Sequence, residues 1–182
     1  MNRKIFVTGD AGFIGGSLIK KLLENKNNYI YNLDKITNVS DINRIREFNE
    51  STNKYNFHKV DIYDAKRLNH LFESIKPDLV VHLAAESSVD KSLTIPNDFI
   101  KSNIIGTFNL LEASREHWCK MPKEKQITFK FHHISTDEVF GSLGRNGEFD
   151  ENSNYDPRSP YSASKASSDH LVSSWFHSYG LP

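Results

Sequence analysis

The stretch Thr8-Gly9-Asp10-Ala11-Gly12-Phe13-Ile14-Gly15 decides the fold that we predict for this chain. A short apolar run precedes it and apolar residues at helical spacing follow it, which indicates a strand, a glycine turn and a helix. In such a turn Gly9 permits the tight bend, Gly12 lets the backbone approach a pyrophosphate, and Gly15 lets the helix pack against the strand. The N-terminus of the helix would offer free N–H groups to phosphates. We therefore expect the turn, with Phe13 and Ile14 inside it, to bind a dinucleotide.

Outward from this turn, predicted strands and helices alternate along the chain. The helix after Gly12 carries Phe13, Ile14, Leu18, Leu22 and Leu23 at helical spacing, and the helix after Pro96 places Ile100, Ile104, Phe108 and Leu111 on one face. Two further helices begin at Asp64 and Ser162, and Pro77 and Gly180 end them. The predicted strands cover residues 4–8, 29–33, 56–60, 79–83 and 129–134.

This alternation predicts an α/β, Rossmann-like, doubly wound parallel sheet with right-handed crossovers. A chain of 182 residues is long enough for one such domain and too short for two comfortable ones. The polar segment 141–159 is predicted to be a loop, and it is long enough for a functional role.

The composition excludes several classes of partner. Lys+Arg 23 and Asp+Glu 23 cancel, so no global field attracts nucleic acid or anionic lipid. The longest apolar stretch, around residues 79–85, is too short to span a bilayer, and the first residues do not form a signal peptide. Cys119 stands alone and fits a reducing compartment. We expect a cytoplasmic protein with no membrane or nucleic-acid partner and no metal site.

Acidic residues end the second and third predicted strands. Asp34 follows Gly9 at about the distance at which a carboxylate binds the ribose hydroxyls of a dinucleotide. A carboxylate there repels a 2′-phosphate, so NAD is favoured, although Lys35 beside it leaves NADP open. Asp61 is placed to contact the adenine, the alternative being a merely polar strand end. The predicted cofactor-binding set is completed by Lys35, Ile62, Ala84, Tyr161 and Lys165.

Candidate catalytic groups lie near the end of the chain. Tyr161 and Lys165 are four residues apart on one helical face, where an ammonium would lower the pKa of the phenol and make it usable as a base. Thr136, Asp137 and Glu138 follow the fifth predicted strand, and groups beyond strand ends face the ligand crevice of an open parallel sheet. Adjacent acids there suggest one protonated acid and one ionised base. The competing interpretation is a solvated helix N-terminus.

Two other kinds of polar residue follow the strands. Ser87, after the fourth strand, is a candidate substrate contact. We interpret three histidines within the strands, His82, His132 and His133, as structural, with the latter two pointing to opposite faces.

These residues resemble a known family. The glycine turn with Tyr161 and Lys165 resembles the extended short-chain dehydrogenase/reductase superfamily. Three longer runs, residues 82–90, 132–141 and 159–170, are similar to the dTDP-glucose 4,6-dehydratase family over essentially the whole chain. The Thr-Asp-Glu triplet separates that family from the sugar epimerases.

The resemblance implies a lyase that uses NAD, regenerated in each turnover, to convert dTDP-glucose into its 4-keto-6-deoxy derivative. It implies that Tyr161, poised by Lys165, takes the proton of the 4-hydroxyl, to which Thr136 hydrogen-bonds. Glu138 would take the carbon 5 proton and Asp137 would protonate the leaving 6-hydroxyl. It also implies a homodimer, paired through the helix after Pro96 and the helix of Tyr161.

Departures from the family pattern leave alternatives open. Residues 38–41, Asn-Val-Ser-Asp, replace the usual Tyr-Ala-Gly-Asn, and Phe140 stands where tyrosine is common. The family also continues past the equivalent of Pro182 into a lobe that grips the nucleotide, so we expect a truncated chain with little dehydratase activity of its own. The alternatives are another nucleotide-sugar dehydratase or epimerase, and a non-catalytic NAD-binding module.

Overall fold

A computed structural model describes residues 2–37 and 40–182 of the chain. Its centre is a five-stranded sheet in the order β3-β2-β1-β4-β5, with every neighbouring pair parallel. The strands are β1 (Arg3–Thr8), β2 (Asn28–Asp34), β3 (Tyr55–Lys59), β4 (Leu79–His82) and β5 (Lys130–His133). All five strands were predicted, to within two residues at each end. The predicted α/β, Rossmann-like fold class is confirmed.

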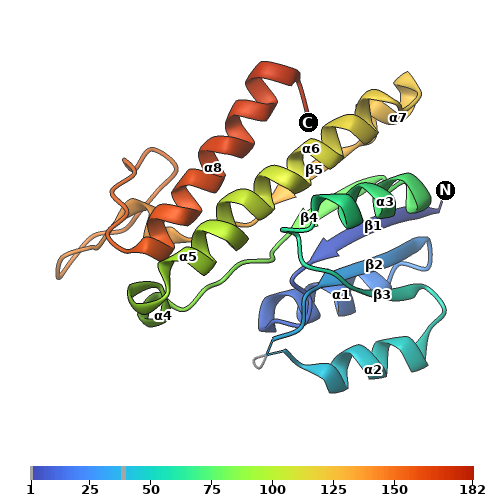
Figure 1. The fold of residues 1–182 in the computed structure, drawn as a ribbon, viewed down its shortest axis with the longest axis horizontal. Coiled ribbons are helices and arrows are strands. Elements are labelled where there is room, and N and C mark those ends of the chain that lie inside the picture. Colours follow the sequence, from blue (N-terminus) through green and yellow to red (C-terminus); the bar gives the residue numbers. More distant parts are fainter. Residues whose placement is uncertain (1, 38–39) are drawn as a thin grey trace.

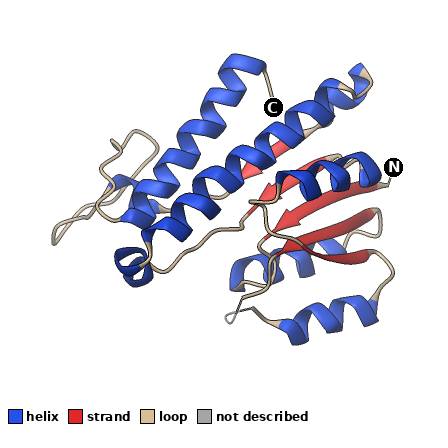
Figure 2. Cartoon of the chain, viewed as in Figure 1, coloured by secondary structure: helices blue, strands red, loops and turns tan. Residues whose placement is uncertain are grey.

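Alternating side chains of β1 divide the core into two layers. Ile5 and Val7 pack with α1 (Phe13–Leu23) and α2 (Ile42–Ser51) on one face of the sheet. Phe6 packs on the other face with α3 (Ala65–Ile75) and α6 (Gly106–Cys119). The two layers are visible on either side of the strands in Figures 1 and 2. Burial on both faces explains why the central strands β1 and β4 are mostly apolar.

The helices begin and end near the capping residues that the sequence predicts. Asp64 caps α3 by accepting a hydrogen bond from the Arg67 backbone N–H. Helix α8 (Pro160–Tyr179) begins two residues before the predicted Ser162, because Ser159 and Ser162 form a capping box. Gly180 ends α8 with φ +72°.

Four short elements were not predicted from the sequence. Besides α2, these are α4 (Val89–Thr94), α7 (Lys123–Thr128) and the 3₁₀ turn η2 (Asp137–Phe140). Segment 141–159 contains no helix or strand, as predicted.

The long helix after Pro96 is real, but its predicted apolar face is not continuous. The helix runs through α5 (Pro96–Phe99), the π-helical segment η1 (Ile100–Ile105) and α6, and it lies beside α8 (Figure 1). Leu111 is buried, whereas Ile100 and Phe108 are 44% and 40% exposed. A π-helical turn inserts an extra residue and rotates the faces on either side of it, so α-helical spacing cannot be extrapolated through it.

Candidate functional site

The glycine turn lies where β1 meets α1 and is sterically restricted. Gly9 has φ +80°, and a Cβ there would lie 2.6 Å from the Ala84 backbone nitrogen. A Cβ on Gly15 would lie 2.6 Å from the carbonyl oxygen of Gly9. Only glycine fits at either position, as the pattern predicted. Gly12 caps α1 without a side-chain acceptor, which leaves the first turn of the helix open to an anion.

A cavity of about 380 Å³ opens beside this turn. It lies at the carboxyl ends of the strands, between β1 and β4, where the strand order reverses. This is the place at which ligands bind to open parallel sheets. Every residue predicted to bind the cofactor lines the cavity, and so does Ser87: Gly9, Gly12, Phe13, Ile14, Gly15, Asp34, Lys35, Asp61, Ile62, Ala84, Ser87, Tyr161 and Lys165.

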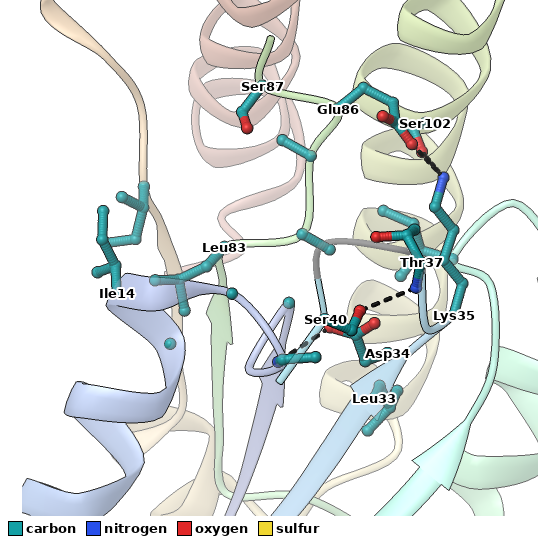
Figure 3. A pocket seen from close by; sticks show the side chains of 18 of the residues that line it. Ile14, Leu33, Asp34, Lys35, Thr37, Ser40, Leu83, Glu86, Ser87 and Ser102 are labelled. Carbon is teal, nitrogen blue, oxygen red and sulfur yellow. Dashed lines mark hydrogen bonds and ion pairs between the residues drawn. The ribbon is translucent and has the colours of Figure 1, made fainter. Parts of the chain in front are cut away.

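Phe13 and Ile14 are at the cavity and not in the core. They are 85% and 63% exposed, and Ile14 borders the opening in Figure 3. The buried apolar residue of this helix is Ile19. The position of Phe13 and Ile14 on the cavity is compatible with the predicted contact to the cofactor, which stays a prediction.

The Asp34 carboxylate is at the base of the cavity and is 9% exposed. It accepts hydrogen bonds from the backbone N–H groups of Ala11 and Ile36, at 3.1 and 2.8 Å. Burial raises the pKa of Asp34, and the two backbone donors partly offset this effect. The carboxylate thus links β2 to the glycine turn, a structural role that the sequence did not predict.

Lys35 binds two side chains across the cavity. Its Nζ lies 2.5 Å from Glu86 Oε1 and 3.2 Å from Ser102 Oγ (Figure 3). Ser102 belongs to η1, as does Asn103, whose side chain exchanges two hydrogen bonds with the backbone of Glu86. The π-helical segment therefore holds the loop after β4 against the cavity. No sequence signal identified Glu86, Ser102 or Asn103 in this role.

Tyr161 and Lys165 line the same cavity. Tyr161 is 8% and Lys165 is 4% exposed, and Lys165 Nζ donates a hydrogen bond of 2.6 Å to the Ile134 carbonyl oxygen. Burial lowers the pKa of Lys165 from 10.5 to about 8. The two residues predicted on one helical face do reach one site.

The expectation that Lys165 lowers the pKa of Tyr161 is not met in this structure. The Tyr161 pKa is raised, first by burial and then by the negative charges of Glu138 and Asp137, against an opposing hydrogen bond with Thr136. The desolvation of the phenolate outweighs the favourable contacts.

The acidic pair lies close to Tyr161 but outside the cavity wall. Ile134 and Ser135 line the cavity, whereas Thr136, Asp137 and Glu138 do not. Thr136 is the N-cap of η2, and its Oγ1 accepts a 3.4 Å hydrogen bond from the Glu138 N–H. The acids therefore also occupy a helix N-terminus, as the competing interpretation supposed. Both nevertheless act on the pKa of Tyr161.

Three buried groups beneath the glycine turn were missed. Asp10, 1% exposed, accepts hydrogen bonds from Asn32 Nδ2 at 2.7 Å and from Tyr55 OH at 2.9 Å. Its Oδ1 has no partner among the described residues. Burial raises the pKa of Asp10 to about 6, the Tyr55 hydrogen bond opposes the rise, and the Asp34 charge adds to it. The sequence offered no signal, because the three residues come from separate segments.

The histidines of the strands are placed as structural residues. His82 is 1% exposed and bonds to the hydroxyls of Thr8 and Thr107, at 2.8 and 2.9 Å. His132 is exposed and His133 is partly buried on the opposite face.

Two further predictions concern the segment after β2 and metal binding. Within segment 38–41, Asn38 and Val39 lie outside the described residues, while Ser40 lines the cavity and Asp41 caps α2. In the described part of the chain, no three His, Cys, Asp or Glu side chains are grouped so as to hold a metal ion. Nor is any described helix long and apolar enough to cross a membrane.

Sheet order, glycine turn and cavity together define a Rossmann-like α/β protein. A family model described as GDP-mannose 4,6 dehydratase matches residues 6–182, and the chain belongs to this family.

Individual relatives agree with this assignment. A dTDP-glucose 4,6-dehydratase of Neisseria meningitidis serogroup B is 50% identical over 99% of this chain and 51% of its own length. The crystal structure of dTDP-glucose 4,6-dehydratase from Bacillus anthracis in complex with NAD has a TM-score of 0.83 at 34% identity, over 99% of this chain and 52% of that one. A Thermus thermophilus UDP-glucose 4-epimerase complex with NAD has a TM-score of 0.83 at 29% identity, over 98% and 52%. The chain thus spans about half the length of the relatives that it matches.

Proposed function

We propose that residues 1–182 are the NAD-binding and catalytic part of a dTDP-glucose 4,6-dehydratase, a lyase that yields dTDP-4-keto-6-deoxyglucose and water. One observation carries the proposal. The glycine turn, Asp34, Tyr161 and Lys165 line the same cavity. Relatives with this name, at 45–50% identity, support the choice of substrate.

The residues present fit NAD. The restricted turn at Gly9 leaves backbone N–H groups for a pyrophosphate, and the Asp34 carboxylate favours ribose hydroxyls over a 2′-phosphate. Lys35 is neutralised by Glu86, which weakens the case for NADP. When bound, NAD would supply a reversible acceptor for a hydride. Tyr161 and Lys165, which line the same cavity, would then flank the reacting sugar.

Each catalytic group has a role in the proposed reaction. Tyr161 removes the proton of the sugar 4-hydroxyl, and Thr136 hydrogen-bonds to the same oxygen. Once carbon 4 is a ketone, the carbon 5 proton is acidic, and Glu138 removes it. Asp137 protonates the 6-hydroxyl as it leaves as water. The hydride taken from carbon 4 would then return to carbon 6, and carbon 5 would take back a proton, which gives the 4-keto-6-deoxy product. Ser87, on the cavity wall, would contact the substrate.

Homodimerisation and a cytoplasmic location belong to the same proposal. The long helix exposes Ile100, Ile105 and Phe108, and α8 exposes Phe176 and Tyr179. Apolar side chains on two adjacent helices are what a four-helix contact between two copies requires. The free Cys119 fits a reducing compartment.

A chimera tests the proposal. Residues 1–182 would be joined to the remaining half of the Neisseria meningitidis relative, and product formation from dTDP-glucose followed by NMR. We expect turnover that is lost in Tyr161→Phe and Asp137→Asn variants and kept in Asp98→Asn, an exposed control. A folded, NAD-binding chimera that ignores dTDP-glucose but converts another nucleotide sugar would overturn the substrate assignment, and one inert towards all of them would favour a binding module.

A further inference from the structure

Asp169 lies on α8, one helical turn after Lys165, with its side chain 12% exposed. Its Oδ2 accepts hydrogen bonds from Ser135 Oγ at 2.6 Å and from Tyr155 OH at 3.1 Å. Its Oδ1 lies 3.1 Å from His133 Nε2, within ion-pair distance although the atoms are not aligned for a hydrogen bond. One carboxylate therefore contacts three residues, two at the end of β5 and one in segment 141–159.

Asp169 and Lys165 together hold the end of β5. Lys165 binds the carbonyl oxygen of Ile134, and Asp169 contacts the residues on either side of it, His133 and Ser135. Two side chains on one face of α8 thus fix three successive residues. The next residue along the chain is Thr136, which begins the turn that carries both acids.

The same carboxylate holds the segment before α8. Tyr155 belongs to segment 141–159, and besides its bond to Asp169 its ring packs on Phe140, at the end of η2, with centroids 5.5 Å apart. The acid-bearing turn is therefore held from β5 and from this segment, and Asp169 is common to both attachments.

Charge supports the arrangement. Burial alone would raise the pKa of Asp169, but His133 and Ser135 lower it overall, so the group is an anion at neutral pH. The charge of Asp169 shifts the pKa of Tyr161 upward, and it also opposes the lowering of the Lys165 pKa by burial. Asp169 is therefore close enough to act on the two predicted catalytic residues of its own helix.

We propose that Asp169 is a positioning residue that fixes the end of β5, and with it Asp137 and Glu138, relative to Tyr161. The proposal rests on the proposed function for its catalytic meaning. The contacts that it invokes all lie within this chain. Positioning matters for catalysis because a catalytic acid displaced by about 1 Å can lose about 100-fold in rate.

The test uses the 182-residue chain without substrate or NAD. In Asp169→Asn and Ser135→Ala variants, amide hydrogen exchange would be measured by NMR at Glu138 and Val139, whose N–H groups bond to Thr136, and at residues 5–8 of β1 as reference. Lysine labelled at the side chain would report the titration of Lys165. Ser167→Ala, a hydroxyl on the same helix that bonds only within it, is the matched control.

We expect exchange at Glu138 and Val139 to rise by about tenfold in both variants with β1 unchanged. In Asp169→Asn the Lys165 pKa should also fall below its value of about 8. Unchanged exchange in both variants would overturn the proposal, and so would equal acceleration in β1, which would indicate only a loss of overall stability. A failed dehydratase assay in the chimera would leave these results untouched, so the two proposals fail separately.

Discussion

Lys165 Nζ and the carbonyl oxygen of Ile134 are joined by a 2.6 Å hydrogen bond that connects α8 to the end of β5. The buried ammonium is thus held between the cavity and the sheet. Because its pKa is lowered to about 8 while the unfolded value is 10.5, the unfolded chain binds this proton more tightly between those pH values. The charged lysine therefore opposes folding below about pH 8, and stability rises with pH across the window.

Lys165→Met should reveal this effect. The free energy of unfolding of the wild type, relative to the variant, should increase by up to about 3 kcal/mol between pH 8 and pH 10.5. Urea denaturation at several pH values measures it, and subtracting the variant removes the contribution of the tyrosines. A difference that stays constant with pH would show that Lys165 titrates at its ordinary value.

The titration of Asp10 should make the stability of the chain depend on pH with the opposite sign, so that stability falls as pH rises. Its folded pKa of about 6 exceeds the unfolded 3.8, so the stability that comes from its proton is complete below about pH 4 and is lost as pH rises through 6. Asp10→Asn, which can still accept from Asn32 and Tyr55, should gain up to about 3 kcal/mol relative to the wild type between pH 4 and pH 7. Thermal or urea unfolding of both proteins would test this, with Asp98→Asn as the exposed control.

Asp34→Asn should weaken NAD binding by about 10- to 100-fold, because hydrogen bonds to a charged carboxylate contribute about 1.5–3 kcal/mol. The affinity for NADP should fall by a smaller factor, since the substitution also removes the repulsion between the Asp34 carboxylate and the 2′-phosphate. Calorimetry with both nucleotides measures the ratio. Equal losses for the two nucleotides would argue that Asp34 only supports the turn through Ala11 and Ile36.

Gly9→Ala should destabilise the chain by more than about 2 kcal/mol, because the new Cβ meets the Ala84 backbone in a left-handed conformation. Gly144→Ala, where a Cβ would meet nothing within 4 Å, should change the stability by less than about 1 kcal/mol. Denaturant midpoints give both values. Similar effects of the two substitutions would contradict the close approach of the turn to the strand.

The 182-residue chain should bind NAD but show no measurable turnover of dTDP-glucose. The matched dTDP-glucose 4,6-dehydratases are about twice as long as this chain, so we expect the 182 residues alone to position the sugar poorly. Product formation monitored by NMR at high protein concentration is the check. Turnover by this chain alone would show that positioning of the sugar needs nothing more.

Local sequence patterns predicted the structure correctly where the nearby backbone requires one particular type of residue. Gly9, Gly15, the Asp64 cap and the Gly180 stop were all predicted, because each lies in a turn or helix end with a local backbone requirement. The close approach of Ala84 to Gly9 comes from a distant segment and was not predicted. The discontinuity at Ile100–Ile105 was not predicted. Asn103, within it, bonds to Glu86 from another part of the chain, and such a contact leaves no local pattern in the sequence.

By itself, the sequence determined the alternation of strands and helices, the glycine turn and the gathering of strand-end residues at one edge of the sheet. All of these depend on periodicity, sterics and the rule that parallel strands end at one edge. Only the tertiary structure decided that Asp10 is buried with Asn32 and Tyr55, that Asp169 holds the end of β5, and that the pKa of Tyr161 rises. Burial and long-range contact set the hydrogen bonds and pKa values of these groups, and neither is encoded in the spacing of residues along the chain.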